Sequence, residues 1–384
     1  MFFSDMIRAF FKKGDVLLFT LCVAASGFGL ALIYSSTRYN PALSSYPLKQ
    51  ALFIVLGMVA YFIFTFIDIE WVLEKSWWIF LVASIVLLLM LIPFGVSDNT
   101  GNRNWMYIPG IPIGIQPAEI VKLFFVLVLA RIMVKNREFG ISRPGSVFLL
   151  AGFTGFFMVL NTALSDDFGM SLVYLFIFAI MAFVAGVKLR WFVLALGGGG
   201  CGLALLWSYL PNHIQMRFRV LFDHSLDPQG TGWHQTRSLL AIGSGQITGM
   251  GYLNGQQTQS PFESSLPARH TDFIFSVCGE ELGMVGCIAL LLLLLAIILR
   301  CIQVSRKARS HLSAYIALGF AGMLMVQIAI NVGMCLYVAP VVGLTLPFIS
   351  YGGSSILTLF AAMGVVSNIK SRSLPSWLRD RSSL

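Results

Sequence analysis

A short polar stretch at the start of a long apolar run contains the residues best suited to chemistry. Arg269, His270 and Asp272 fall within residues 266–275, LPARHTDFIF, and the apolar run continues to about Leu299. A run of this length spans a bilayer, so the three side chains are expected at a membrane surface. A carboxylate there can accept a proton and a guanidinium can bind an anion. The pattern favours chemistry on a molecule with a polar head and a lipid tail.

The composition is that of an integral membrane protein. Of 384 residues, 57% are hydrophobic and 11% are charged, whereas soluble domains carry about 25% charged residues. The net charge of +9 does not indicate a nucleic-acid partner, because basic residues in membrane proteins mark cytoplasmic loops. The cysteines lie in or beside apolar runs without a C-x-x-C pattern, which favours small buried side chains over disulfides or zinc ligands.

Ten stretches contain the roughly 20 mostly apolar residues that a spanning helix needs. They lie near residues 15–35, 48–67, 76–94, 118–134, 146–164, 168–186, 190–209, 273–301, 312–337 and 351–369. The predicted fold class is an all-α membrane protein, a polytopic bundle of about ten transmembrane helices with a large structured extracytoplasmic loop. Residues 1–384 are expected to form a single membrane domain.

Lys and Arg residues set the expected orientation. They are more than twice as frequent on the side of the N-terminus as on the other, so both termini are predicted to be cytoplasmic and Asp272 to lie on the outer face. Residues 1–14 are predicted as an interfacial segment and 370–384 as a cytoplasmic tail. The outer loop 210–272 exceeds the usual 2–8 residues. Its apolar residues predict amphipathic helices on the membrane surface.

Two pairs of polar residues share helix faces within predicted spans. Glu119 and Lys122 are spaced i, i+3, and Gln327 and Asn331 are spaced i, i+4. Ionisable residues in spans are costly and usually functional, so we favour a substrate cavity for Glu119 and Lys122 over helix pairing. For Gln327 and Asn331 we favour polar contacts between helices.

Three other features have competing interpretations. Glu280 and Glu281 would lie about 12–13 Å beyond Asp272 along a regular helix, and function and packing both stay open for them. The run Gly197–Gly200 predicts close helix contact or a kink. Asp167 follows Ser165-Asp166 and is interpreted as a helix cap rather than a catalytic group.

Two classes of site are disfavoured by missing patterns. No two histidines stand at i, i+4 and no H-E-x-x-H occurs, which disfavours zinc. No G-x-x-x-x-G-K-[ST] occurs either, which excludes ATP bound at a P-loop as the energy source.

The motifs, taken together, resemble the SEDS (shape, elongation, division and sporulation) family. The resemblance rests on residues 266–275, on Glu-Glu-Leu-Gly at 280–283, on PFISYGGSS at 347–355, on QPAEIVK at 116–122 and on NVGM at 331–334. It covers nearly the whole chain, and the ten-helix plan agrees with it.

The resemblance implies a function and a partner. Within the family, Arg269-His270 and residues 253–260 resemble the elongation branch rather than the division branch. The family polymerises lipid II into peptidoglycan glycan strands in the bacterial cytoplasmic (inner) membrane, usually with a class B penicillin-binding protein, a transpeptidase. Its essential aspartate corresponds to Asp272.

The implied substrate suggests how Asp272 would act. The donor is α-linked to a polyprenyl diphosphate and the product is β-1,4, so the centre inverts. A single inverting displacement needs a base and no covalent nucleophile. Asp272 is the candidate base, and holding a divalent cation, Mg²⁺ or Mn²⁺, is its alternative role. Arg269 and Lys122 are candidate contacts of the diphosphate.

Further substrate-binding candidates are Glu119, Gln116, Gln259, Trp105 and His270. For His270, substrate contact and a structural role at the helix start stay open. For Trp105, stacking on a sugar and interfacial anchoring stay open.

Two other functions compete with polymerisation. A lipid II flippase would use intramembrane Glu and Lys side chains along a headgroup path, but the sequence shows no matched inverted repeats and its polar residues cluster toward the outer surface. A scaffold that recruits the transpeptidase would leave the polar cluster around Asp272 unexplained. We favour the polymerase over both.

Overall fold

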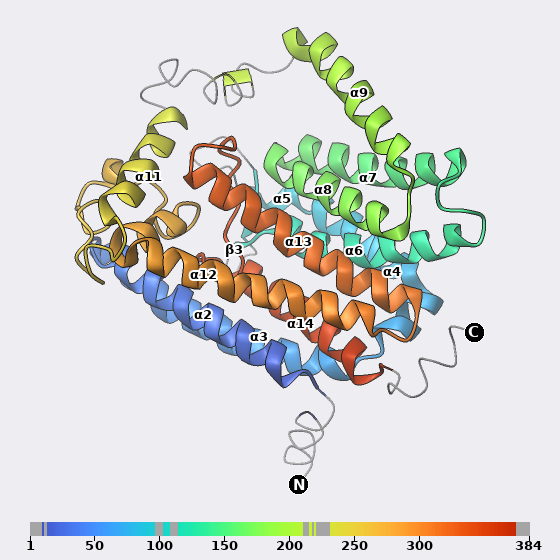
Figure 1. Ribbon diagram of the computed structural model, residues 1–384, viewed down its shortest axis with the longest axis horizontal. Helices are drawn as coiled ribbons and strands as arrows, with labels where there is room; N and C mark the ends of the chain where they lie inside the picture. The colour runs from blue at the N-terminus through green and yellow to red at the C-terminus, as the bar shows by residue number, and fades with distance from the viewer. Residues whose placement is uncertain are drawn as a thin grey trace.

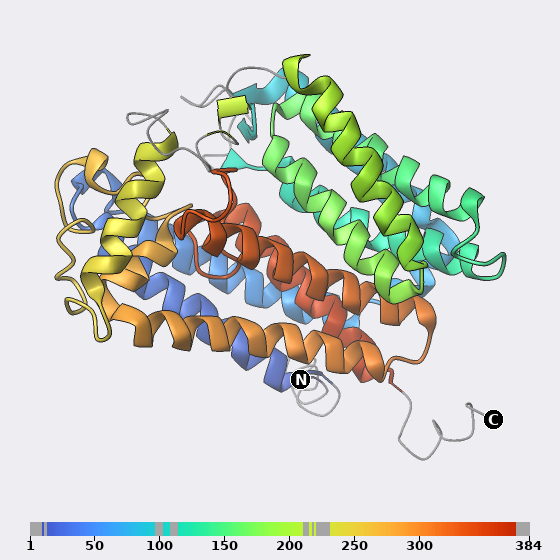
Figure 2. The same ribbon diagram turned by 45° about the horizontal axis from the view of Figure 1, so that its top comes forward.

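Long helices packed side by side make up most of the chain (Figures 1 and 2). The structure is a computed structural model that describes residues 10, 14–96, 103–107, 114–209, 215–216, 219 and 231–373. Its long helices are α2 (Val16–Thr37), α3 (Tyr46–Phe66), α4 (Ile69–Leu89), α6 (Pro117–Arg137), α7 (Pro144–Ser165), α8 (Phe168–Ala185), α9 (Leu189–Leu206), α11 (Thr231–Gly245), α12 (Ile274–Arg306), α13 (His311–Cys335) and α14 (Gly353–Ser371). A helix stands at each of the ten predicted spans.

Eight of the helices in the described part of the chain are long and apolar enough to cross a membrane. The all-α polytopic fold class is therefore confirmed. Helices α6 and α9 are not among the eight. Helix α6 carries Glu119, Lys122, Arg131 and Lys135, which make it more polar than a typical span.

The helices pack in pairs that are often distant in sequence. Helix α3 lies against α14, α4 against α6, and α12 against both α13 and α2. Figure 2 shows α12, α13 and α14 running side by side through the middle of the molecule. Buried apolar side chains from α2, α6, α8 and α12–α14 form one continuous core. This core holds the starts of α6, α12 and α14 at one end of the bundle, called here the site end.

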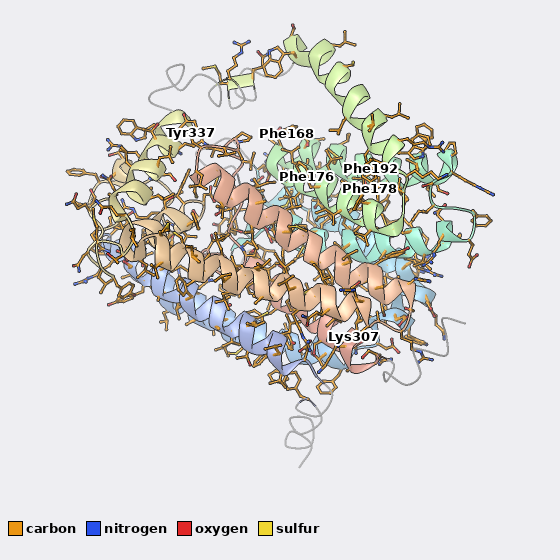
Figure 3. All side chains as sticks on the ribbon, in the orientation of Figure 1. Phe168, Phe176, Phe178, Phe192, Lys307 and Tyr337 are labelled. Atoms are coloured by element: carbon orange, nitrogen blue, oxygen red, sulfur yellow. The ribbon has the colours of Figure 1, made fainter. Side chains whose placement is uncertain are left out.

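Helix α9 stands apart from the bundle in Figure 1. A Cβ added at any residue of Gly197–Gly200 would have no heavy atom of another segment within 4 Å. The prediction that this run permits close helix contact is therefore wrong in this structure. The aromatic Phe176 and Phe178 of α8 and Phe192 of α9 lie on this side of the molecule (Figure 3).

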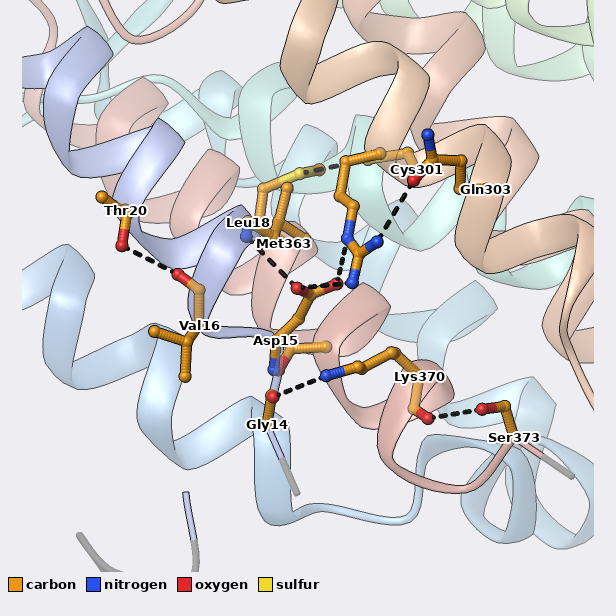
Figure 4. Close-up of polar contacts among 12 residues, drawn as sticks. Gly14, Asp15, Val16, Leu18, Thr20, Cys301, Gln303, Met363, Lys370 and Ser373 are labelled. Atoms are coloured by element: carbon orange, nitrogen blue, oxygen red, sulfur yellow. Dashed lines mark hydrogen bonds and ion pairs between the residues drawn. The ribbon is translucent and has the colours of Figure 1, made fainter. Parts of the chain in front are cut away.

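An ion pair between a buried aspartate and a partly exposed arginine closes the end of the bundle away from the site end. Asp15 caps α2 by accepting the backbone N–H of Leu18, and its carboxylate accepts from Arg300 at 2.8 and 3.0 Å. Lys370 of α14 donates to the Gly14 carbonyl at 2.9 Å (Figure 4). These contacts join α2, α12 and α14. Residues 1–9 and 374–384, which hold most of the predicted interfacial segment and tail, lie outside the described residues.

Three short strands precede α6 at the site end. The short helix α5 (Leu91–Phe94) leads into β1 (Gly95–Val96), which pairs antiparallel with β2 (Trp105–Tyr107). Strand β2 pairs in turn with β3 (Gly114–Ile115), in the register Met106 to Ile115. The sheet brings Trp105 close to the start of α6. Residues 97–102 and 108–113, which connect the strands, lie outside the described residues.

The long loop runs along α12 rather than only over the membrane surface. Helix α11 packs against α12 and α13, and residues 246–251 then follow α12 where its dihedrals break at Gly283 (φ 67°). There Met284 and Val285 donate backbone N–H groups to the carbonyls of Gln246 and Ile247 at 2.9 and 3.1 Å. The break leaves backbone N–H groups of α12 without helical acceptors, and carbonyl groups of the loop accept from them instead. The predicted surface helices are thus, in the described part, one helix docked on the bundle.

Candidate active site

A cavity of about 380 Å³ opens at the site end. Residues from β2, from the starts of α6 and α12, from α11 and from the segments 341–345 and 351–355 form its wall. They are Asn104, Trp105, Gln116, His234, Ala268, Thr271, Asp272, Phe273, Val341, Val342, Gly343, Thr345, Tyr351, Gly352, Ser354 and Ser355. Of the predicted site residues, Asp272, Trp105 and Gln116 meet there.

The backbone on either side of Asp272 is held by hydrogen bonds from other elements. Asn331 of α13 donates its amide to the Asp272 carbonyl at 2.9 Å and to the Leu344 carbonyl at 2.6 Å. Ser350 donates its hydroxyl to the Thr271 carbonyl at 2.6 Å. These contacts join the segment before α12 to α13 and to the chain before α14. They fix Asp272 at the cavity wall.

Asn331 thus makes the predicted polar contact between helices, whereas Gln327, on the same helix face, does not. Gln327 is fully buried, and within the described residues neither atom of its amide has a hydrogen-bond partner. The expectation of a polar helix contact therefore holds for Asn331 and not for Gln327.

The Asp272 carboxylate sits in an environment that favours its neutral form. Burial, followed by the charge of Asp167, raises the pKa of Asp272 to about 6. Asp167 caps α8 by accepting the backbone N–H of Met170 at 2.9 Å, as predicted from its position. Its second oxygen accepts from the Asn104 amide at 3.2 Å. A carboxylate with a pKa near 6 is a stronger base than a free aspartate and is still mostly ionised at pH 7.

Replacing Asp167 with asparagine is expected to move the acid limb of the pH–rate profile to lower pH. If Asp272 must be ionised, the rate falls as pH drops through about 6. Removing the Asp167 charge lowers that pKa, because a like charge disfavours ionisation. Asparagine is as good a helix cap as aspartate, so α8 should be retained. An unchanged acid limb, measured from pH 5 to 8, would show that Asp272 does not set it.

Two acceptor atoms in the cavity wall have no hydrogen-bond partner among the described residues. They are Oδ1 of Asn104 and Oγ1 of Thr345. Buried polar atoms normally find a partner, so both mark polar positions beside the cavity that a sugar hydroxyl or amide N–H group could satisfy once the side chain rotates toward it. Sequence reasoning missed both residues. Thr345 stands alone in an apolar segment that gives no signal, and Asn104 is recognisable only beside Trp105.

Tyr351 adds a phenol to the same wall. Its ring stacks on Tyr46, with centroids 4.4 Å apart. Burial and the neighbouring Tyr46 and Tyr107 raise the pKa of Tyr351 to about 12. The phenol therefore stays protonated at neutral pH and can donate a hydrogen bond. Tyr351 belongs to the recognised segment 347–355, although its side chain was not singled out.

Arg269 lies outside the cavity wall, with 1% of its surface exposed. Its guanidinium donates at 2.5 to 3.1 Å to five backbone carbonyls, those of Gln257, Thr258, Ser260, Phe262 and Leu266. It also lies over the Tyr39 ring, 3.8 Å from the centroid. The guanidinium organises the loop, so we do not retain Arg269 as a diphosphate contact.

His270 is also absent from the cavity wall. Its ring packs edge-on against the stacked pair of Tyr46 and Tyr351, at centroid distances of 5.4 and 6.0 Å. Burial and the Arg269 charge lower the pKa of His270 to about 4, so the imidazole is neutral at pH 7. This placement favours the structural interpretation of His270 over substrate contact.

The two glutamates of α12 hold the loop in place. Glu280 accepts from the backbone N–H groups of Gln257 and Thr258 at 2.6 and 2.8 Å. Glu281 accepts from Ser35 at 2.6 Å and from the amide of Gln259 at 3.0 Å. The open question for the glutamates is thereby decided toward packing. The Gln259 amide donates hydrogen bonds to side chains of α2 and α12, and Gln259 does not line the cavity.

Glu119 and Lys122 form a buried ion pair on α6, at 2.8 Å, with side chains 3% and 1% exposed. Neither residue lines the cavity, although Gln116 one turn earlier does. The ion pair lies next to the site, within the helix that carries Gln116. Its observed partner is internal rather than a substrate.

Replacing Lys122 with alanine is expected to destabilise the protein by roughly 3–5 kcal/mol, because it leaves the Glu119 charge buried and unpaired. The thermal unfolding midpoint in detergent measures this. The paired variant Glu119→Leu with Lys122→Met removes both charges and should regain most of the stability. A stable but inactive paired variant would instead support a contact between Lys122 and the substrate.

The cavity wall is poor in positive charge. Among the described residues, no Lys or Arg lines it, and no group of three or more His, Cys, Asp and Glu is arranged to hold a metal ion. A cation there would be held by Asp272 and by oxygens of a bound diphosphate, which is a common mode for Mg²⁺. The residues present fit that mode.

Comparison with known proteins identifies the family. The sequence model of the family described as "Cell cycle protein", which names FtsW, RodA and SpoVE, matches residues 15–374. The chain belongs to this family, the SEDS proteins. It is 35% identical over 289 residues to the peptidoglycan glycosyltransferase MrdB of Escherichia coli K12, covering 74% of this chain and 75% of that protein.

Another relative and two solved structures agree over more of the chain. The stage V sporulation protein E of Bacillus subtilis is 31% identical and covers 92% of this chain and 96% of its own. Thermus thermophilus RodA superposes with a TM-score of 0.68 at 27% identity, covering 94% and 98%. A chain from a structure of a peptidoglycan synthase complex reaches 0.76 at 30% identity, covering 96% and 98%. The SEDS fold thus extends over the whole bundle.

Proposed function

We propose that this SEDS protein, a peptidoglycan glycosyltransferase, polymerises lipid II into glycan strands at the outer face of the cytoplasmic membrane during cell elongation. The observation that carries the proposal is Asp272, a carboxylate in the wall of a cavity at one end of a membrane-spanning bundle, on a backbone segment held by hydrogen bonds from Asn331 and Ser350. The enzyme class is that of MrdB, which the chain resembles over three quarters of its length.

Asp272 acts as the general base in this proposal. It takes the proton from the acceptor's 4-hydroxyl while that oxygen attacks the anomeric carbon of the donor. The bond from that carbon to the polyprenyl diphosphate breaks, and the configuration inverts. A pKa of about 6 keeps most of the carboxylate ionised at pH 7 and close to the value that favours proton transfer.

The remaining cavity residues suit sugar binding. The indole of Trp105 can stack on a pyranose face, and the unpartnered oxygens of Asn104 and Thr345 can accept from the sugar. The hydroxyls of Ser354 and Ser355 lie at the start of α14, where the helix end favours negative charge. This region is our candidate for the diphosphate.

The leaving diphosphate needs positive charge, and no Lys or Arg supplies it from the described cavity wall. A divalent cation, Mg²⁺ or Mn²⁺, held by Asp272 and the diphosphate would neutralise it. This is the alternative role of Asp272, and it uses the same carboxylate. EDTA is therefore expected to lower the rate, with Mg²⁺ or Mn²⁺ restoring it.

The membrane arrangement and the partner complete the proposal. The bias of Lys and Arg supports an outer position for the site end and cytoplasmic termini. A class B penicillin-binding protein is the expected partner, because one similar chain comes from a peptidoglycan synthase complex that couples polymerization and crosslinking. The transpeptidase would cross-link the strands that this protein extends.

Reconstitution tests the proposal directly. The protein and its transpeptidase partner are placed in liposomes with labelled lipid II, and products are separated on a gel. Glycan chains are expected with the partner's transpeptidase blocked by penicillin, because polymerisation does not need cross-linking. Accelerated exchange of lipid II between leaflets, with no chains formed, would contradict the proposal and assign a flippase.

A further inference from the structure

A second cavity, of about 900 Å³, lies between α4, α6 and α7. It is formed by the middle and later part of α4, the last part of α6 and roughly the first half of α7. Helix α6 begins at the site end with Gln116 and Pro117, so its last turns lie in the other half of the bundle. This cavity is therefore separate from the one that contains Asp272. We call it the α4–α6–α7 groove.

The wall of the groove is apolar and aromatic. Trp77 of α4 faces it together with Phe148, Phe153 and Phe156 of α7. Phe148 and Phe156 are 67% and 47% exposed, so the groove opens toward the outside of the bundle. In a chain that spans a membrane, this opening faces lipid. The wall matches acyl chains in its chemistry.

One end of the groove is basic. Arg131 and Lys135 line it from α6 at i, i+4, on the same helix face. They lie about 9 and 3 Å before the last residue of the helix, Arg137. Glu138 also lines this end, so two cations face one carboxylate. A net positive charge remains at about the depth where lipid phosphates lie.

Arg131 has no side-chain partner in the part of the chain that the structure describes. Among the described residues it forms neither an ion pair nor a hydrogen bond through its side chain, and Asn136 nearby donates its amide to the Ile132 carbonyl instead. A cation one or two turns inside a spanning helix is costly unless a counter-charge or polar headgroup meets it. An external anion would provide that partner.

We propose that the α4–α6–α7 groove binds one anionic phospholipid of the leaflet opposite the active site. Arg131 and Lys135 contact its phosphate, and its acyl chains lie against Trp77, Phe153 and Phe156. The bound lipid fills the space between three helices that otherwise leave an apolar hollow. A partner helix would suit this groove less well, because its wall ends in two cations rather than continuing as an apolar surface. The proposal does not depend on the glycosyltransferase activity.

The test is a lipid titration of the purified full-length protein in detergent, followed by native mass spectrometry. Phosphatidylglycerol is compared with phosphatidylcholine of the same acyl chains, and preferential retention of phosphatidylglycerol is expected. Arg131→Gln with Lys135→Gln should weaken that retention roughly fivefold for each charge removed. Equal retention of both lipids by the wild type would overturn the proposal.

A matched control removes the same charge elsewhere. Arg306→Gln with Lys307→Gln lies at the end of α12, where both residues are exposed and outside the groove. This control should bind phosphatidylglycerol like the wild type. Equal weakening in the control would show a general charge effect and would contradict a groove site.

A second measurement needs no charge variant. Phosphatidylglycerol brominated on its acyl chains should quench tryptophan fluorescence more strongly in the wild type than in Trp77→Phe, because Trp77 lies in the groove wall. Equal quenching in both proteins would contradict the assigned acyl position. Because the readouts are binding and fluorescence, they stay informative even if reconstituted protein makes no glycan.

Discussion

Alanine in place of Asp272 is expected to reduce glycan polymerisation by about 10²–10⁴-fold, the range that a general base contributes. The carboxylate lies in the cavity wall, where it can take the acceptor's proton, and burial raises its pKa to about 6. The backbone contacts from Asn331 and Ser350 do not involve the side chain. The variant should therefore fold, with a thermal midpoint no lower than that of the wild type.

Two further variants make this result specific. Asp272→Asn keeps the size of the side chain and removes the base, and it should be as inactive as alanine. Thr345→Val keeps the shape of a neighbouring wall residue and removes an unpartnered hydroxyl, and it should raise the KM more than it lowers the kcat. Normal chain synthesis by Asp272→Asn would contradict both proposed roles of the carboxylate, as base and as cation ligand.

Arg269→Ala is expected to destabilise the protein by roughly 3–5 kcal/mol, although this residue lies outside the cavity. Five backbone carbonyls between residues 257 and 266 lose their donor, and buried unsatisfied groups cost about 1–3 kcal/mol each before relaxation. The loop would detach from Glu280 and α12. Polymerisation should fall as a consequence, because Asp272 follows this loop directly.

Hydrogen exchange and the thermal midpoint check this expectation. Faster exchange is expected at residues 255–266, with a lower unfolding temperature. Arg269→Lys should restore little, because an ammonium cannot reproduce the fork of donors. Arg38→Ala, at an exposed arginine just after α2, serves as the control and should change neither. A stable Arg269→Ala variant that has lost activity would instead support a contact between Arg269 and the diphosphate.

The predicted role of each charged residue depended on contacts that the sequence does not reveal. Arg269 and Lys122 were predicted at the diphosphate because cations near a membrane surface bind anions. In the folded chain, Arg269 donates hydrogen bonds to loop carbonyls and Lys122 forms an ion pair with Glu119. A buried cation must be satisfied wherever the chain places it, and its nearest acceptors are known only once the loop has folded against α12.

The sequence by itself determined the ten helices and the position of Asp272 at the start of one of them. Both follow from local properties: the length of an apolar run and the polar residues that bound it. The tertiary structure decided what surrounds that carboxylate. Asn331 and Ser350 hold its backbone, Asp167 lies near enough to raise its pKa, and Asn104 and Thr345 face the same cavity. These residues come from separate elements, so only the packing of the helices brings them together.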